Sequence, residues 1–219
     1  MFIAIIPAYN EEGHIGSVVR DLFEHVDKVV VVDDGSEDNT VNIAKDLGAE
    51  VLQHKINRGQ GAAIETGHEY ARKVGAEYVV HFDGDGQFDV LDIAPALEKI
   101  KEHNADVLFG SRYLDNRSQV PWLKKNILLP LGRIINRIFT GLKLSDAHNG
   151  FRILNKKALD NIIITQNGMA HASEIMGLVK ENNLTYVEFP IKVTYHEFGQ
   201  GISGGIKTVR DLLVGRFVK

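Results

Sequence analysis

The chain has 219 residues, no cysteine and a formal net charge of −4, from 25 Lys and Arg against 29 Asp and Glu. Its 44% hydrophobic and 25% charged residues exclude a disordered chain, and the lack of cysteine excludes disulfides, Cys-ligated zinc, iron–sulfur clusters and a thiol nucleophile. No apolar run approaches the ~18 residues of a transmembrane helix, and no basic leader precedes the first strand pattern, so we expect a cytoplasmic location.

The charges are distributed unevenly along the chain. Residues 1–110 contain 9 basic and 21 acidic side chains, whereas residues 111–219 contain 16 basic and 8 acidic ones. Such a division is a reason to expect a membrane or a polyanion on the basic side, and scattered surface charge is the alternative.

The first half alternates between two periodicities. Short apolar or β-branched segments predict buried strands at 2–7, 28–33, 50–54, 77–82 and 106–110. Helical periodicity between them predicts helices at 12–25, 39–47, 60–74 and 89–103. This alternation predicts an α/β fold, with a Rossmann-like, mainly parallel sheet flanked by helices on both faces.

The second half is less regular. An apolar stripe predicts a helix over 122–142 that Pro130 kinks, and we expect a helix at 174–180 and a strand at 184–193. A glycine-rich loop at 199–205 precedes a C-terminal amphipathic helix at 206–218. We find no linker, and we expect residues 1–219 to form one domain.

Polar turns follow three of the predicted strands. They read Pro7-Ala8-Tyr9-Asn10-Glu11, Asp33-Asp34-Gly35-Ser36 and Asp83-Gly84-Asp85-Gly86-Gln87. Each could be an ordinary turn, because these residue types are common in turns. Ligands of such sheets bind at the carboxyl ends of the strands, so three acidic turns at corresponding ends predict a shared site.

The Asp83 and Asp85 pair indicates a metal. Two carboxylates that approach one point repel each other, and a hard divalent cation removes that cost. Mg²⁺ takes one or two carboxylates together with phosphates and waters, and Gln87 adds a neutral oxygen. Gly84 permits close approach of a ligand to the backbone. We therefore interpret this turn as a metal–diphosphate site.

Six motifs together carry a family resemblance. In chain order they are Ile6-Pro7-Ala8-Tyr9-Asn10-Glu11, Val32-Asp33-Asp34-Gly35-Ser36, Asn57-Arg58-Gly59-x-Gly61, Asp83-x-Asp85-x-Gln87, Gly110-Ser111-Arg112 and Asp146-x-x-x-Gly150-Phe151-Arg152. From residue 3 to about 193 the sequence resembles family 2 glycosyltransferases of the GT-A fold. Within that family it looks most similar to the polyprenyl- or dolichyl-phosphate sugar (mannose or glucose) synthases.

The resemblance implies roles for the matching residues. Nucleotide-sugar binding would involve Pro7, Tyr9, Glu11, Asp34, Gly59, Asp83, Gly84, Asp85 and Arg112. Asp83, Asp85 and Gln87 would hold Mg²⁺ or Mn²⁺. Asp85, Arg112 and Asp146 would be the catalytic residues, with Arg112 facing the leaving diphosphate and the Asp146–Arg152 segment bordering the acceptor. Residues 1–110 would then be the nucleotide-sugar half, and 111–205 the acceptor half.

The late region departs from the family pattern. The synthases have an Arg and a Gly-x-Ser-Lys that close over the nucleotide, whereas this chain has no Lys directly after Ser203. His196 or Lys207 would take that part, or the donor differs. Lys124 and Lys125 lie about where the synthases have an arginine for the acceptor phosphate.

The implied reaction is an inverting transfer of a sugar from a UDP-, GDP- or dTDP-sugar to a polyprenyl phosphate. A lipid phosphate is already ionised near pH 7 and needs no base, whereas a sugar hydroxyl acceptor in cell-surface glycan assembly would need one. Asp146 and Glu174 are the candidates for that base, with His148 and His171 behind them. None stands out, which favours the phosphate.

The basic segments predict peripheral attachment to the cytoplasmic face of the membrane. Residues 112–143 contain seven basic residues and one acidic residue, and the helix at 206–219 is basic and amphipathic. Such helices lie on anionic membranes. They could instead pack on the core, on a second copy of the chain or on a membrane subunit. We expect no nucleic-acid partner.

Two other function classes remain open on the sequence alone. A sugar-1-phosphate nucleotidyltransferase also uses an α/β sheet and Mg²⁺, but it would need a glycine-rich basic loop where this chain has Ala8-Tyr9-Asn10-Glu11-Glu12. An inactive scaffold subunit is the other class, and the intact acidic motif argues against it.

Overall fold

The computed structural model describes residues 1–115, 117, 141–147 and 149–194. These form a seven-stranded sheet with the order β3-β2-β1-β4-β6-β5-β7. The strands are β1 (Phe2–Ala8), β2 (Lys28–Asp33), β3 (Glu50–Gln53), β4 (Tyr78–His81), β5 (Val107–Ser111), β6 (Arg152–Asn155) and β7 (Tyr186–Pro190). Within this sheet β6 runs antiparallel to its neighbours β4 and β5, and every other pairing is parallel.

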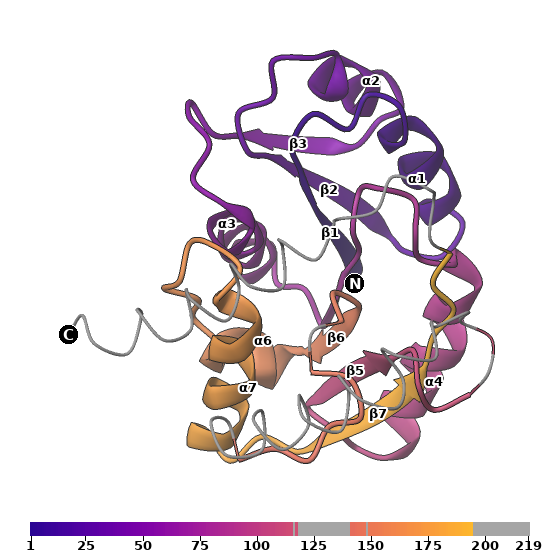
Figure 1. Cartoon of the computed structure of the whole chain (residues 1–219), viewed down its shortest axis with the longest axis vertical. Helices are drawn as coiled ribbons and strands as arrows, with labels where there is room; N and C mark the ends of the chain where they lie inside the picture. The colour runs from indigo at the N-terminus through magenta and orange to yellow at the C-terminus, as the bar shows by residue number, and fades with distance from the viewer. Residues whose placement is uncertain (116, 118–140, 148, 195–219) are drawn as a thin grey trace, which may run out of the picture.

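Helices cover both faces of the sheet (Figure 1). They are α1 (Ile15–Leu22), α2 (Thr40–Asp46), α3 (Gln60–Lys73), a 3₁₀ turn η1 (Val90–Asp92) that leads into α4 (Ile93–Glu102), α6 (Lys156–Asn161) and α7 (His171–Glu181). One apolar core contains buried residues of α1, α2 and α4, and the other contains those of α3, α6 and α7. The molecule is therefore a three-layer α/β/α sandwich.

The pleat of β1 explains the two cores. Ala4 and Ile6 lie in the core under α1, and Ile3 and Ile5 lie in the core under α3. Successive side chains of a strand point to opposite faces, so a strand covered on both faces must be apolar throughout. Each isoleucine is 0% exposed, and burying such a side chain contributes about 2 kcal/mol.

The structure confirms the expected α/β class and the alternation of the first half. The strand expected at 184–193 is β7, and the helix expected at 174–180 is α7, which begins earlier, at His171. The sequence did not predict β6 or α6. The strand has only four residues with polar residues at both ends, and the helix has only six residues, so both are too short for a clear periodicity. The helix expected at 122–142 lies outside the described residues except for its last two, and the 199–205 loop and the C-terminal helix lie wholly outside them.

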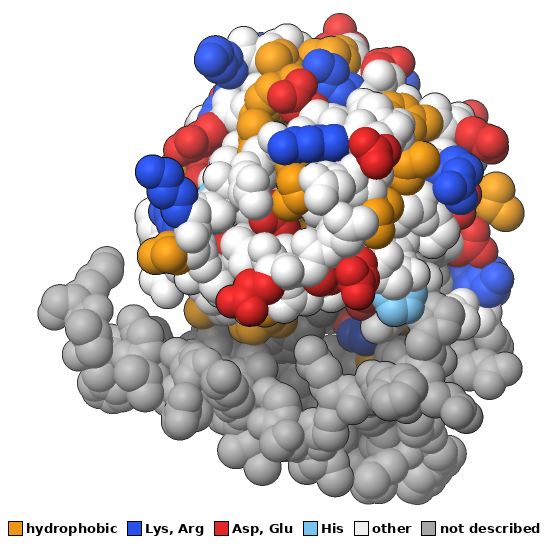
Figure 2. Space-filling model, turned by 90° about the horizontal axis from the view of Figure 1, so that it is seen from above, with side chains coloured by type: hydrophobic (Ala, Val, Ile, Leu, Met, Phe, Trp, Pro, Cys, Tyr) orange, Lys and Arg blue, Asp and Glu red, His pale blue; other side chains and the backbone are white. Residues whose placement is uncertain are grey.

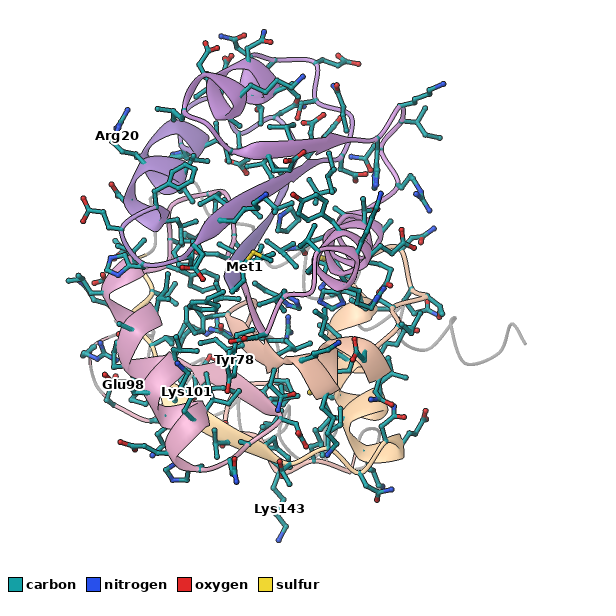
Figure 3. The ribbon with its side chains drawn as sticks, turned by 180° about the vertical axis from the view of Figure 1, so that it is seen from behind. Met1, Arg20, Tyr78, Glu98, Lys101 and Lys143 are labelled. Carbon is teal, nitrogen blue, oxygen red and sulfur yellow. The ribbon has the colours of Figure 1, made fainter. Side chains whose placement is uncertain are left out.

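The strand order brings the predicted polar turns together. β1 pairs in parallel with β2 on one side and β4 on the other, so the carboxyl ends of all three lie at one edge of the sheet. At the opposite edge, Figure 3 shows Met1, Tyr78 and Lys101 close together, and the ammonium of Lys101 lies 5.4 Å from the centre of the Tyr78 ring.

The surface over the β3 side of the sheet is mixed in charge. Figure 2 shows acidic, basic and scattered hydrophobic side chains interspersed over the end of the molecule that carries α2 and β3. Across the part of the chain that the structure describes, none of the helices is both long and apolar enough to cross a bilayer.

Candidate active site

The loops after β1 and β2 are joined into one unit by hydrogen bonds. The backbone N–H of Asn10 donates to Ser36 Oγ at 2.8 Å, and that of Glu11 donates to Thr40 Oγ1 at 2.8 Å. In return, the N–H of Glu37 donates to Asn10 Oδ1 at 2.9 Å. This pairing fixes Glu11 at the carboxyl edge.

The carboxylate of Asp34 is fully occupied by protein donors. It accepts the backbone N–H groups of Arg58 at 2.8 Å and Gly59 at 2.7 Å, and its Oδ1 lies 2.7 Å from Nδ1 of His54. Asp34 is 4% exposed. These contacts hold the loop that starts α3 against the end of β2. The expected contact of Asp34 with a nucleoside stays a prediction, and we see a structural task for this side chain as well.

The glycines of the Asn57–Gly61 motif permit two backbones to touch. A Cβ at Gly59 would lie 2.4 Å from the carbonyl oxygen of Asn167, and one at Gly61 would lie 2.0 Å from that of Gln166. Gly59 also has a φ of +102°, which side chains rarely adopt. The loop that precedes α7 therefore packs directly on the amino end of α3, a contact that the sequence did not predict.

Three carboxylates converge after β1 and β4. Burial, together with the Asp85 and Glu11 carboxylates and against the opposing charge of Arg152, raises the pKa of Asp83 to about 7. Burial, followed by the Asp85 carboxylate, also raises the pKa of Glu11, which His14 opposes. A Cβ at Gly84 would lie 3.7 Å from Cγ of Glu11, so the turns after β1 and β4 lie against each other, as the strand order requires.

The Asp146–Arg152 motif reaches the same place. A Cβ at Gly150 would lie 2.5 Å from Oδ2 of Asp83, so only glycine leaves room for this carboxylate. On its other side, Nε2 of Gln60 donates a hydrogen bond of 3.2 Å to Oδ1 of Asp83. Asp83 thus lies between the amino end of α3 and the turn before β6.

The donor set fits a divalent cation that brings its own phosphate ligands. Across the described ranges, no cluster of three or more His, Cys, Asp or Glu side chains forms a complete metal site. Mg²⁺, however, needs only one or two carboxylates beside phosphates and waters. The pKa of Asp83 is raised first by burial and then by the neighbouring carboxylates, and a bound cation would favour the charged form against both. Asp85 is oriented by the N–H of Gln87, which donates to its Oδ1 at 3.0 Å.

Arg112 and Asp146 form a bidentate ion pair. Nε and Nη2 of Arg112 donate to the two oxygens of Asp146 at 2.7 and 2.8 Å, and the N–H of Arg112 adds a third bond of 3.1 Å. Asp146 is 4% exposed. Because both of its oxygens are engaged, Asp146 is suited to orient the guanidinium rather than to take a proton from a substrate.

Glu174 also has a structural task. Its carboxylate accepts the backbone N–H groups of Thr165 and Gln166 at 3.0 and 2.9 Å, which holds the loop before α7. His148, another expected base, lies outside the described residues.

A buried polar cluster adjoins Asp83. Nε2 of His68 lies 2.7 Å from Nε2 of His81, and His81 pairs with Arg152 across β4 and β6. Burial lowers the pKa of Arg152 to about 10, against the Asp83 and Asp146 carboxylates, and lowers that of His171 to about 4. Three of these residues line a pocket of about 70 Å³, together with Pro7, Gln60, Ile64, Asp83, Gly150, Met169 and Ala172.

Sequence reasoning missed this cluster, because its members are spread from residue 68 to 171 and no local pattern connects them. The available signal was a polar residue at the end of an otherwise apolar strand, as at His81.

Comparison with known proteins now places the chain. The profile described as "Glycosyl transferase family 2" matches residues 3–163. The chain belongs to glycosyl transferase family 2. It is 33% identical over 236 residues to the UDP-N-acetylglucosamine–dolichyl-phosphate N-acetylglucosaminyltransferase of Methanococcus voltae, covering 96% of this chain and 94% of the relative. It is 26% identical over 210 residues to the polyprenol monophosphomannose synthase of Mycolicibacterium smegmatis, covering 90% and 78%.

The fold has a solved counterpart as well. Glucosyl-3-phosphoglycerate synthase from Mycobacterium tuberculosis, crystallised with Mn²⁺, UDP and glucosyl-3-phosphoglycerate, superimposes with a TM-score of 0.73 at 17% identity, covering 97% of this chain and 77% of that one. These findings confirm the family 2 membership, the GT-A-like fold and the prediction of a glycosyltransferase that uses a nucleotide sugar.

Proposed function

We propose that this glycosyltransferase moves a sugar, with inversion, from a nucleoside-diphosphate sugar to a polyprenyl phosphate, with Mg²⁺ or Mn²⁺ at Asp83 and Asp85. The observation that carries the proposal is the group of Glu11, Asp83 and Asp85 carboxylates, in which the pKa of Asp83 is raised to about 7 beside the turn of Gly150. Relatives that are named for dolichyl- and polyprenyl-linked sugar transfer support the choice of acceptor.

Asp83 and Asp85, with the side chain of Gln87, would hold the cation that binds the donor diphosphate. When bound, the metal neutralises the charge of the diphosphate. Tyr9 is 47% exposed at the end of β1, where its ring is available to a nucleobase beside Pro7. Asp34 acts on the donor through the loop of Arg58 and Gly59, which it holds at the end of β2.

The reaction is a displacement at the anomeric carbon. A phosphate oxygen of the acceptor forms the new bond to that carbon, and the bond to the diphosphate breaks with its electron pair leaving on the nucleoside diphosphate. Arg112 stabilises that leaving charge, and Asp146 holds its guanidinium in place. The acceptor phosphate enters ionised, so no proton has to be removed.

The engaged carboxylates favour this acceptor over a sugar hydroxyl. A hydroxyl would need a base within hydrogen-bond reach. Asp146 is bound to Arg112 and Glu174 to the loop before α7, and the lowered pKa of His171, about 4, makes it a weak base. A phosphate nucleophile requires none of them.

The membrane contact is the part of the proposal that depends on the basic segments 112–143 and 206–219. Between two buried leucines, Leu142 and Leu144, the side chain of Lys143 points away from the body of the protein (Figure 3). At these three residues the leucines are buried and the lysine is exposed, which supports an outward-facing basic side at this point of the segment. We infer peripheral attachment at the cytoplasmic face of the membrane, and a second copy or a membrane subunit is the competing partner.

Two measurements test the proposed function. The first is a thermal-shift panel of UDP-, GDP- and dTDP-sugars with Mg²⁺ or Mn²⁺, in which one nucleotide should raise the melting temperature only when metal is present. The second is transfer from that donor to a short polyprenyl phosphate. Pyrophosphate release from a nucleoside triphosphate would favour a nucleotidyltransferase, and the absence of any nucleotide-sugar binding would favour a scaffold.

Attachment has its own test. Flotation with liposomes that contain anionic lipid should carry the protein upward at low salt and less of it at high salt. Liposomes of neutral lipid are the matched control. Equal flotation with both, or none with either, would contradict a basic membrane-facing side.

A further inference from the structure

The pocket beside Asp83 is lined by two residues that each have a buried side-chain nitrogen without a partner in the described part of the chain, His81 at Nδ1 and Arg152 at Nε. It lies between the carboxyl end of β4, the start of β6 and the amino end of α7, with a volume of about 70 Å³. Asp83, Arg152 and His171 all line it. Any group that enters this pocket meets these three side chains at once.

The tautomer of His171 follows from one contact. Its Nδ1 lies 2.9 Å from the carbonyl oxygen of Gly168. A carbonyl oxygen only accepts, so Nδ1 carries the hydrogen and Nε2 presents a lone pair. Burial, with the nearby charge of Arg152, keeps the pKa of the ring at about 4, and the ring is therefore neutral at physiological pH. Among the described residues, Nε2 has no hydrogen-bond partner.

Arg152 supplies the complementary donor. It is 1% exposed, and within the described part of the chain its Nε–H has no acceptor. Its Nη1 makes only a long bond of 3.4 Å to the carbonyl oxygen of Gly150. Buried donors in native proteins nearly always have partners, so the unpartnered Nε–H of Arg152, in a pocket that His171 also lines, indicates a missing group.

The chemistry of the pocket selects a hydroxyl. A hydroxyl can accept from Arg152 and donate to His171, whereas a phosphate only accepts and would meet both a lone pair and the Asp83 carboxylate. An apolar group would leave both atoms unsatisfied. The transferred sugar carries hydroxyls, and it is bonded to the diphosphate that Asp83 would hold.

We propose that this pocket receives a hydroxyl of the transferred sugar and that His171 is a specificity-determining residue, whose Nε2 accepts the hydrogen bond from that hydroxyl. This inference rests on the proposed function, because it places the donor sugar at Asp83. The hydrogen bond to His171 would let the protein select a sugar that has a hydroxyl at this position over one that lacks it.

Two substitutions separate this role from a structural one. In His171→Asn the amide nitrogen stands near the position of Nδ1, so it keeps the bond to Gly168 and removes the acceptor at Nε2. In His171→Gln the amide oxygen stands near the position of Nε2, so it keeps an acceptor in the pocket and gives up the bond to Gly168. A residue that only holds the loop would tolerate Asn better, and a residue that binds the sugar would tolerate Gln better.

The measurement is calorimetric binding of the free nucleoside diphosphate and of its sugar conjugate, both with Mg²⁺. The conjugate is the one that most stabilises the wild type in the panel. We expect His171→Asn to bind the nucleoside diphosphate as the wild type does and the conjugate about tenfold or more weakly, with His171→Gln in between. In wild-type protein, a donor deoxygenated at the recognised hydroxyl should show the same loss, and His171→Asn should not weaken it further.

The outcomes distinguish the two levels of proposal. If the wild type binds no nucleotide sugar, the proposed function fails. If the wild type binds it and His171→Asn binds both ligands as the wild type does, or weakens both equally, the role of His171 is overturned. Should His171→Asn fail to fold, the series of deoxy donors on wild-type protein decides, because equal binding of every deoxy sugar would exclude a hydroxyl pocket.

Discussion

Asp34 and Asp83 follow the two strands that flank β1, yet their surroundings differ. Asp34 accepts hydrogen bonds from the N–H groups of Arg58 and Gly59 and contacts His54, so its charge is satisfied by the protein itself. Asp83 has one amide donor, from Gln60 at 3.2 Å, and it faces two more carboxylates. Two similar acidic turns therefore have different roles: Asp34 holds a loop in place, whereas Asp83 is available to bind a cation.

If the turn of Asp83 binds a cation and that of Asp34 does not, the largest effect on sugar transfer is expected from Asp85→Ala. Loss of a charged ligand to the diphosphate site should reduce transfer by about 10²–10³-fold, as removal of one electrostatic stabiliser does in other enzymes. Metal-dependent nucleotide binding should be lost with it, while the melting temperature stays within a few degrees. Asp160→Asn, at an exposed ion pair with Lys156, is the matched control. Unchanged turnover in Asp85→Ala would refute the assignment of the site.

The second largest effect is expected on the stability of a variant at Asp34. Asp34→Ala should lower the free energy of unfolding by about 2–3 kcal/mol, because two buried N–H groups and His54 lose their acceptor. Asp83→Asn, which relieves carboxylate repulsion but removes one of the two counter-charges of Arg152, should lower it less. Urea denaturation of both variants without metal measures the difference. Equal destabilisation of the two would break the contrast between them.

A smaller effect is expected where the backbone makes room for Asp83. In Gly150→Ala the new Cβ would lie 2.5 Å from Oδ2 of Asp83, so the carboxylate must move and metal affinity should fall about tenfold. Gly177→Ala, in α7, is the control, because a Cβ there meets nothing within 4 Å. Titration of Mn²⁺ in the presence of nucleotide measures the affinity, and equal affinities in the two variants would show that Asp83 does not bind the ion.

The smallest effect is expected on the stability of the protein at acidic pH. Burial lowers the pKa of His171 to about 4, below the usual value of 6.5, so the unfolded chain binds more protons between these values. Stability that is fully present above pH 6.5 is therefore lost as the pH falls toward 4. From pH 7 to pH 5.5 the wild type should lose about 1 kcal/mol more than His171→Asn. Urea denaturation at the two pH values measures this difference. If both proteins lost the same free energy of unfolding, a buried neutral His171 ring would be contradicted.

The sequence was sufficient for the parts that depend on local pattern and strand order. Apolar runs and helical periodicity defined the alternating elements of the first half, and the parallel order then brought Glu11, Asp83 and Asp85 to one edge. The family motifs supplied Arg112 and Asp146 as a pair of interest, but not the bidentate contact between them.

The features that the sequence did not predict depend on long-range packing. β6 begins with Arg152, a charge that is tolerated in a short strand because Asp83 and Asp146 lie near it after folding. The donors to Asp34 come from a loop some 24 residues away in the chain, and His68, His81 and His171 meet only when α3, β4 and α7 assemble. No local window of sequence contains these relations.

The close approach of the glycines at 59 and 61 to the backbone of residues 166 and 167 has a consequence for re-engineering. There is no space between these segments for a methyl group, so the loop before α7 cannot be lengthened or rebuilt without shifting the start of α3. A library intended to change the accepted sugar should therefore keep the backbone from Thr165 to Gly168 and vary side chains instead. Met169, which is 55% exposed at the pocket rim, suits such variation, whereas a library at His171, which is 3% exposed and bonded to Gly168, should be limited to side chains that keep that bond.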